Sequence, residues 1–327
     1  MKKRIAFFVL ASFICSSISA QRYFEVNDIR YRVIADADEA STYGTVSVAK
    51  PEVGEYEDDI KIPTVVKETD DQYADAYKVI SIDEKAFSNM DNLKSVELPP
   101  TIEIIGKDAF ECSVGLNHVI IPVGNLTEIS SGAFYRTGLV DIQIPSSIKV
   151  IGNSAFASCY DLTTVTFNGD ITTIGNSAFA KCKGIKQLKL PNTVRLIGEH
   201  AFYECENLEE IILGTGIQSL GDYVFEKCEK LKSIELPEGL KNIGKFAFSG
   251  TSITEIIIPE SIREIKAGTF SSSKLKKIKL PQRLRSIDGD AFFGLDLEKI
   301  EIPATTKIDK DAFRRATING EPYNNKE

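Results

Sequence analysis

Phenylalanine recurs along most of this chain at a nearly constant interval. The repeating residues are Phe87, Phe110, Phe134, Phe156, Phe179, Phe202, Phe225, Phe248, Phe270, Phe292 and Phe313. The gaps between them run from 21 to 24 residues. Self-similarity at such a period is the signature of a stacked repeat architecture, because one unit alone cannot bury its apolar face. The sequence therefore predicts a repeat solenoid of about eleven coils, each 22–24 residues long.

Each unit follows the form I-G-x-x-A-F-x-x-C-x-x-L-x-x-I-x-L-P. The L-x-x-I-x-L segment, such as 93–98, predicts a short strand with alternating inward and outward side chains, and the following proline ends it. The glycine of the I-G pair is expected at a turn with positive φ. The A-F-x-x-C segment is too short for an independent helix. We expect it to form one helical or 3₁₀ turn with its Ala and Phe pointing inward.

This pattern closely resembles the BspA-like leucine-rich repeat over about residues 80–316. The resemblance implies a β-rich, right-handed leucine-rich repeat superhelix with a parallel sheet on its concave side. Proteins of this family are exported by bacteria or displayed on some protozoa, and most are linked to adhesion and protein binding. The resemblance thus implies a protein ligand, such as a host matrix protein or an envelope protein.

The first twenty residues have the form of a secretory signal peptide. Lys2, Lys3 and Arg4 precede an apolar run over 5–14, which is too short to span a bilayer of about 30 Å as a helix. Small residues then lead to Ala20, where we expect cleavage. A lipid anchor on Cys15 is disfavoured because no small residue precedes it. The mature protein is expected to be periplasmic, secreted or on the cell surface, with no integral membrane segment.

Four parts of the chain follow from these patterns. The signal peptide occupies 1–20, and 21–80 are expected to form an N-terminal β-hairpin cap with a degenerate first coil near 59–63. The leucine-rich repeat solenoid is expected over 81–316, and 317–327 form a polar tail. A cap is expected because the open end of a repeat core needs a cover.

The charge and composition exclude several classes of function. The formal net charge is −8, and removing the signal peptide leaves 36 basic against 47 acidic residues, a charge of −11. Phosphate binding needs an excess of Lys and Arg, so nucleic acid is not expected as a partner. Two histidines, no tryptophan and no recognisable catalytic or phosphate-binding motif predict a protein that is not an enzyme, with no cofactor and no metal.

Five cysteines remain after cleavage, namely Cys112, Cys159, Cys182, Cys205 and Cys228. The last four are separated by the repeat period of 23 residues. Side chains in the same phase of a solenoid run parallel rather than face each other, which disfavours disulfides. We expect all five to be free thiols in the core phase, where Cys behaves as a small hydrophobe.

The candidate binding residues are those that flank the centre of each predicted strand and point outward. They are Asp141, Gln143, Thr164, Thr166, Gln187, Lys189, Glu210, Ser233, Glu235, Glu255, Lys277 and Lys279. Their charges are mixed and none is aromatic, which disfavours a glycan ligand on this sheet. The sequence predicts an exported, non-catalytic, adhesion-type module that binds a protein through its concave sheet.

Three alternatives stay open. The first is a carbohydrate-binding or cell-envelope structural protein that contacts glycans through lateral tyrosines, Tyr135 and Tyr203. The second is an enzyme whose residues lie in the N-terminal cap, and the third is a passive spacer without a partner. The oligomeric state is not predicted.

Overall fold

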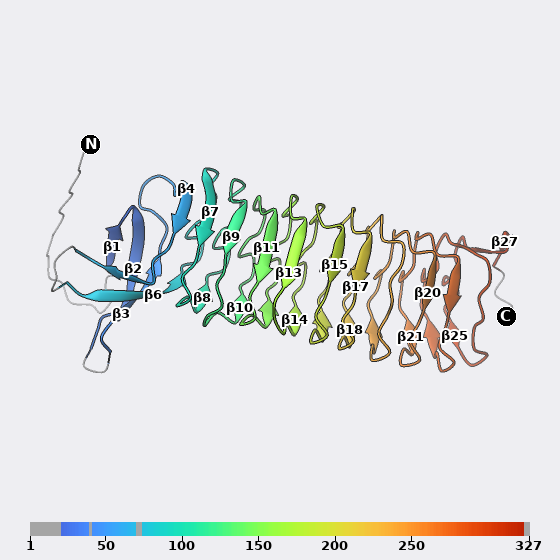
Figure 1. The fold of residues 1–327 in the computed structure, drawn as a ribbon. Helices are drawn as coiled ribbons and strands as arrows, with labels where there is room; N and C mark the ends of the chain where they lie inside the picture. The colour runs from blue at the N-terminus through green and yellow to red at the C-terminus, as the bar shows by residue number, and fades with distance from the viewer. Residues whose placement is uncertain (1–20, 39–40, 70–73, 324–327) are drawn as a thin grey trace, which may run out of the picture.

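The computed structural model describes residues 21–38, 41–69 and 74–323. The predicted signal peptide, 1–20, lies outside these ranges. The described chain forms an N-terminal sheet followed by an elongated β-solenoid of about ten turns (Figure 1). A single apolar core runs through both parts, from Phe24 to Phe313.

The N-terminal sheet covers one end of this core. Its strands, in spatial order with β8 pairing to β6, are β1(Tyr23–Val26), β2(Ile29–Ala35), β3(Gly44–Val48), β6(Ala76–Ile82), β5(Val65–Lys67) and β8(Ile104–Ile105). Strands β1 to β3 pair antiparallel, whereas β3 pairs with β6 and β6 with β8 in parallel. Tyr31 and Tyr77 are fully buried beneath the sheet, so the cap and the solenoid share one hydrophobic core.

One side of the solenoid carries the longer strands, which we call the long-strand row. They are β4(Asp58–Lys61), β7(Leu93–Glu97), β9(His118–Ile120), β11(Asp141–Ile144), β13(Thr164–Phe167), β15(Gln187–Lys189), β17(Glu210–Ile212), β20(Glu255–Ile257) and β22(Lys277–Lys279). All pairings within this row are parallel. Strand β4 lies at the position expected for the degenerate first coil and pairs with β7.

A second side carries two-residue strands at the I-G motif, which we call the short-strand row. After β8 they are β10(Glu128–Ile129), β12(Val150–Ile151), β14(Thr173–Ile174), β16(Leu196–Ile197), β18(Ser219–Leu220), β19(Asn242–Ile243), β21(Glu264–Ile265), β23(Ser286–Ile287) and β25(Lys307–Ile308). Strands β10 to β19 form one parallel sheet, and β21, β23 and β25 form another. The short-strand ladder is therefore interrupted between β19 and β21.

Three short strands close the C-terminal end, namely β24(Asp296–Leu297), β26(Thr317–Ile318) and β27(Glu321–Pro322). Strand β26 pairs in parallel with β24 and antiparallel with β27. Tyr323 then stacks on Phe313 with 4.0 Å between the ring centroids. The segment assigned to a polar tail thus contains a hairpin as far as it is described.

The repeat phenylalanines form a continuous stack inside the solenoid. Successive rings from Phe87 to Phe313 lie nearly parallel, with centroids 4.9–5.8 Å apart. All of them are buried, which confirms the predicted inward packing. The eleven rings are separated by ten repeat intervals. This agrees with about ten turns rather than the eleven coils expected.

The predicted helical or 3₁₀ turn at the repeat Phe is wrong, because the described residues there form successive β-turns. The amide of Ala109 bonds to Gly106 O in its own coil, whereas the amide of Phe110 bonds to Ala133 O in the next coil. Left-handed residues recur every fourth position, as at Asp108 (φ 54°) and Cys112 (φ 59°). A helix would keep all of these amide bonds within one coil, so the stacking of coils excludes it.

The expected positive φ at the I-G glycines is also wrong, because none of these glycines adopts it. Their role is close approach. A Cβ on Gly221 would lie 2.4 Å from the carbonyl carbon of Gly198, and one on Gly244 would lie 2.3 Å from that of Gly221. The neighbouring coil therefore leaves no space for a side chain.

Candidate functional site

The long-strand row presents all twelve predicted binding residues on one face. Eleven are exposed and Asp141 is half-buried. Ten lie in strands β11, β13, β15, β17, β20 and β22 as expected. The exceptions are Ser233 and Glu235, which belong to no strand, so the predicted strand at this coil is wrong.

Strand pairing between neighbouring coils places the predicted binding residues opposite one another along the long-strand row. Gln187 lies opposite Glu210, and Glu255 lies opposite Lys277. Parallel neighbours of this kind are about 4.8 Å apart. Exposed isoleucines interrupt the polar surface, and Ile257 has 60% of its surface exposed. The face therefore mixes charges with apolar positions that water solvates poorly.

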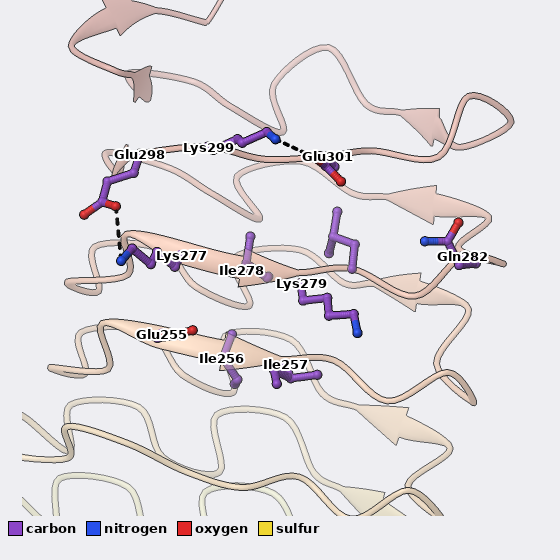
Figure 2. A pocket seen from close by; sticks show the side chains of 11 residues that line it. Glu255, Ile256, Ile257, Lys277, Ile278, Lys279, Gln282, Glu298, Lys299 and Glu301 are labelled. Atoms are coloured by element: carbon purple, nitrogen blue, oxygen red, sulfur yellow. Dashed lines mark ion pairs between the residues drawn. The ribbon is translucent and has the colours of Figure 1, made fainter.

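Some of the charged side chains at the C-terminal end of this face form ion pairs (Figure 2). Lys277 Nζ lies 3.4 Å from Glu298 Oε2, and Lys299 Nζ lies 2.5 Å from Glu301 Oε1. The hydrogen bond from Lys299 lowers the pKa of Glu301. Glu255 has no ion pair within the described part of the chain.

Two adjoining grooves lie on the same part of the face and share residues 255–257. The C-terminal groove, about 470 Å³, is shown in Figure 2 and is lined by Glu255, Ile256, Ile257, Lys277, Ile278, Lys279, Leu280, Gln282, Glu298, Lys299 and Glu301. The second, which we call the acidic groove, has a volume of about 370 Å³. It is lined by Ser233, Ile234, Glu235, Leu236, Glu238, Glu255, Ile256, Ile257 and Pro259.

The acidic groove lies where the backbone ladder of the long-strand row is broken. Every other described segment of this row pairs or hydrogen-bonds with at least one neighbouring coil. Within the described structure, residues 232–236 form no backbone hydrogen bond to either neighbour. At the turns near the repeat Phe the same coil stays attached to both neighbours, since the amide of Glu204 bonds to Glu226 O and that of Lys227 to Ser249 O.

Side-chain packing shows the same opening. A Cβ on Gly216 would lie 2.2 Å from Asn192 O, whereas one on Gly239, one period later, would meet nothing closer than Thr215 O at 3.9 Å. Leu236 and its counterpart in the preceding coil, Leu213, are both only partly buried, whereas Leu190, one coil earlier, is buried. The coil has therefore moved away from its neighbours on this side.

Sequence reasoning missed this break and the residues Glu238, Gln282 and Glu298. The nearest irregularity in the sequence is a change in the spacing of the repeat Phe from 23 to 22 residues at Phe248. The spacing also changes at Phe134 and Phe156, where strands β11 and β13 stay paired, so a change of period does not by itself predict a break.

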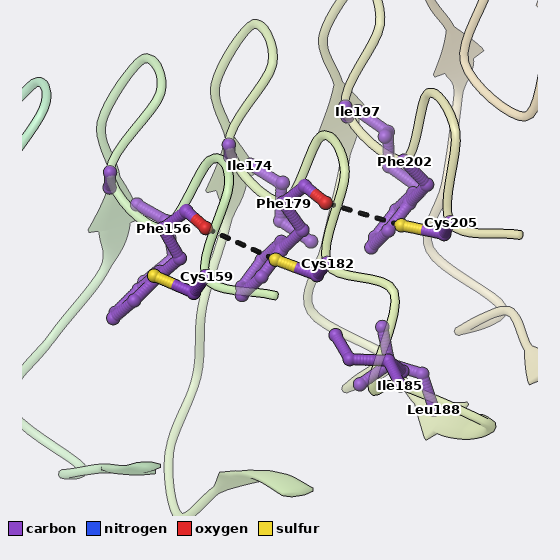
Figure 3. Packing of buried hydrophobic residues seen from close by; sticks show 14 of the residues in the cluster. Phe156, Cys159, Ile174, Phe179, Cys182, Ile185, Leu188, Ile197, Phe202 and Cys205 are labelled. Atoms are coloured by element: carbon purple, nitrogen blue, oxygen red, sulfur yellow. Dashed lines mark hydrogen bonds between the residues drawn. The ribbon is translucent and has the colours of Figure 1, made fainter. Parts of the chain in front are cut away.

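The described cysteines are free, and four of them form a buried ladder as predicted. Each thiol donates a hydrogen bond to the carbonyl of a Phe in the preceding coil, as Cys205 does to Phe179 O at 3.2 Å (Figure 3). Burial raises the pKa of Cys205 to about 12. The assignment of Cys112 to the core phase is wrong, because it lies one residue earlier in the repeat, has positive φ and is partly exposed.

The rings of Tyr203 and Tyr223 do not offer free faces, whereas Tyr135 is half-buried and has no ring or cation contact among the described residues. His200 stacks on Tyr223 and Tyr223 on Phe246, with centroids 4.6 Å and 5.2 Å apart. Lys227 Nζ lies 5.2 Å from the ring centroid of Tyr203 and donates a hydrogen bond to its hydroxyl at 3.0 Å. Sugar stacking needs an open aromatic face. The rings of Tyr203 and Tyr223 are thus poorly placed for a glycan.

No group of three or more His, Cys, Asp or Glu side chains among the described residues is arranged to hold a metal ion. No helix in the described segments is long and apolar enough to cross a membrane.

Comparisons with known proteins agree with this architecture. A search of curated proteins finds no match. Among solved structures, the pneumococcal vaccine antigen PcpA is similar at 19% identity and a TM-score of 0.51, covering 92% of this chain and 98% of its own. A leucine-rich cell surface protein from Faecalibacterium prausnitzii is similar at 23% identity and a TM-score of 0.50, covering 93% and 96%.

At these identities the likeness shows the fold alone. The family model for the BspA-type leucine-rich repeat region matches residues 80–209 and 195–319, in six copies. These ranges take in most of the solenoid. The chain therefore belongs to the BspA-type leucine-rich repeat family.

Proposed function

We propose that this chain is an exported, non-catalytic, adhesion-type module that binds a protein through its long-strand face. The observation that carries the proposal is the C-terminal part of that face, where an exposed Ile257 lies beside two grooves and charges without ion pairs. Protein interfaces combine apolar anchors with a polar rim in this way. The similar protein from Faecalibacterium prausnitzii is a cell surface protein, which is consistent with a surface location for this chain.

The carbohydrate alternative has less support. The twelve predicted face residues include no aromatic side chain, and the rings of Tyr203 and Tyr223 on the turn side are covered by neighbouring groups. A rigid strand face favours a protein partner, because specific protein interfaces bury about 800 Å² on each partner and a row of strands supplies such an area.

The proposal is tested with residues 21–327 on immobilised extracellular-matrix proteins and on envelope proteins of the source cell. One variant reverses the charge of Glu235, Glu255, Lys277 and Lys279. A matched control reverses Glu128, Lys149, Glu264 and Lys307, which are exposed along the short-strand row. We expect saturable binding that falls at least tenfold in the first variant and is unchanged in the second. Equal binding by both variants would contradict the proposal.

A further inference from the structure

We propose that the acidic groove binds an extended peptide segment in which a Lys or Arg is flanked by apolar residues. The bound segment pairs its backbone with the groups that residues 232–236 leave unpaired. This inference rests on the proposed function and specifies the chemistry of the partner. The argument combines the broken ladder, the charge of the groove and its apolar surface.

The backbone of 232–236 is a template for strand addition. In a parallel solenoid the N–H and C=O groups of each long strand point along the axis toward the neighbouring coils. These groups are paired with at least one neighbour elsewhere in the row, but none of the five residues has such a bond in the described structure. Unpaired strand groups pair readily with an added chain, and main-chain bonds then supply affinity.

The charge of the groove selects a cationic segment. Its only charged lining residues are Glu235, Glu238 and Glu255, and no Lys or Arg lines it. None of the three carboxylates has an ion-pair partner among the described residues. A complementary positive charge is therefore favoured, and an acidic segment is rejected by like-charge repulsion.

Apart from Ser233, the remaining lining is apolar and suits the neighbours of that cation. Leu236 and Pro259 lie along the groove, and Ile257 is exposed at its edge. The stem of a Lys or Arg side chain can cover such a surface while its charged end meets carboxylates. The volume of about 370 Å³ lies within the usual range of about 300–1,000 Å³ for ligand sites.

A metal ion is a weaker occupant for the same carboxylates. Within the described ranges, no set of three acidic, His or Cys side chains converges as a cation site would require. The three glutamates are thus spread along the groove, which matches an elongated ligand better than a point charge.

The inference is tested by fluorescence anisotropy with residues 21–327 and labelled, capped six-residue peptides. The probe alternates Val and Lys, a second peptide replaces each Lys by Glu, and a third carries N-methyl groups on alternate amides. We expect saturable binding of the Lys probe, no binding of the Glu probe and at least tenfold weaker binding of the N-methylated probe. The Glu235→Gln/Glu255→Gln variant is expected to bind the Lys probe at least tenfold more weakly, with Glu128→Gln as the unchanged control.

Each outcome bears on the inference separately from the proposed function. Equal binding of the N-methylated probe overturns the backbone pairing, and equal binding by the double Gln variant overturns the role of the carboxylates. If the Lys probe fails to bind but a matrix or envelope protein binds in the charge-dependent way described above, this inference fails and the proposed function stands. A dimer of the chain that dissociates in the double Gln variant would assign the groove to a second copy and also overturn it.

Discussion

Cys182 Sγ donates a hydrogen bond across the boundary between two coils to the carbonyl oxygen of Phe156, at 3.1 Å (Figure 3). Three other buried thiols repeat this contact, and Ser113 makes the equivalent bond to Phe87 O with its hydroxyl. In the inner coils this position therefore holds a small hydrogen-bond donor, Cys, Ser or Thr, although Thr137 and Thr251 donate to the Phe carbonyl of their own coil. The end coils hold Met90, Leu295 and Ala316 there instead.

Replacing Cys182 tests whether its hydrogen bond to Phe156 O stabilises the fold. Cys182→Ala removes the donor and leaves a small cavity, so we expect a loss of about 1 to 2 kcal/mol in the free energy of unfolding. Cys182→Ser keeps a donor and is expected to lose less. Urea denaturation of the two variants measures the difference, and a Ser variant less stable than the Ala variant would contradict the hydrogen-bonding role.

The thiol ladder also predicts a loss of stability at alkaline pH. Burial raises the pKa of Cys159 to about 11 and of Cys205 to about 12, compared with about 8.5 for an unfolded thiol. The folded state thus favours the neutral thiol, whose contribution is complete below pH ~8.5 and decreases as the pH rises from there toward the folded pKa values. In that pH window we expect each thiol to lower the free energy of unfolding by about 1.4 kcal/mol per pH unit.

Urea denaturation between pH 8 and 10.5 checks this prediction. The Cys159→Ser/Cys205→Ser variant is the control, because its hydroxyls do not ionise there and its stability is expected to fall less steeply. The same slope for both proteins would show that these thiols are not the cause.

The Phe stack is expected to hold neighbouring coils together. Phe202 is fully buried, with ring centroids 5.7 Å from Phe179 and 5.5 Å from Phe225. Phe202→Ala is expected to lower the free energy of unfolding by about 3–5 kcal/mol, because it leaves a cavity that the flanking coils cannot fill. A measured loss below about 1 kcal/mol would be incompatible with this packing.

Alanine substitutions at two glycines test how closely neighbouring coils approach each other. Gly221→Ala places a Cβ 2.4 Å from the backbone of Gly198, so we expect it to destabilise the fold by about 1–3 kcal/mol. Gly239→Ala meets nothing closer than 3.9 Å and is expected to have little effect. Thermal unfolding of both variants tests the difference, and equal losses would argue against the open coil at 232–239.

Much of the fold was predictable because it follows from periodicity. The spacing of the Phe residues specifies a stacked solenoid, and the alternation in segments such as 93–98 places the outward residues on one face. The geometry between coils was harder to predict. The amide of Ala109 bonds within its own coil, whereas that of Phe110 bonds to the next coil. The I-G glycines are required because the backbone of the neighbouring coil lies too close for a side chain. Neither feature is determined by local sequence alone.

The candidate site was predictable only in part for the same reason. Exposure of eleven of the twelve residues follows from alternation within one coil. The break at 232–236 depends on how three successive coils align, and the change of period at Phe248 does not by itself predict it. Glu238 follows Pro237, outside the predicted strand, and lines the acidic groove from there.

Amide hydrogen exchange of residues 21–327 tests the central structural claim most directly. If the long-strand ladder is open at one coil, the amides of 232–236 exchange much faster than those of the paired strands β15 and β20, while the flanking Phe225 and Phe248 amides stay protected. Protection of 232–236 equal to that of β15 and β20 would show a continuous ladder and contradict the account.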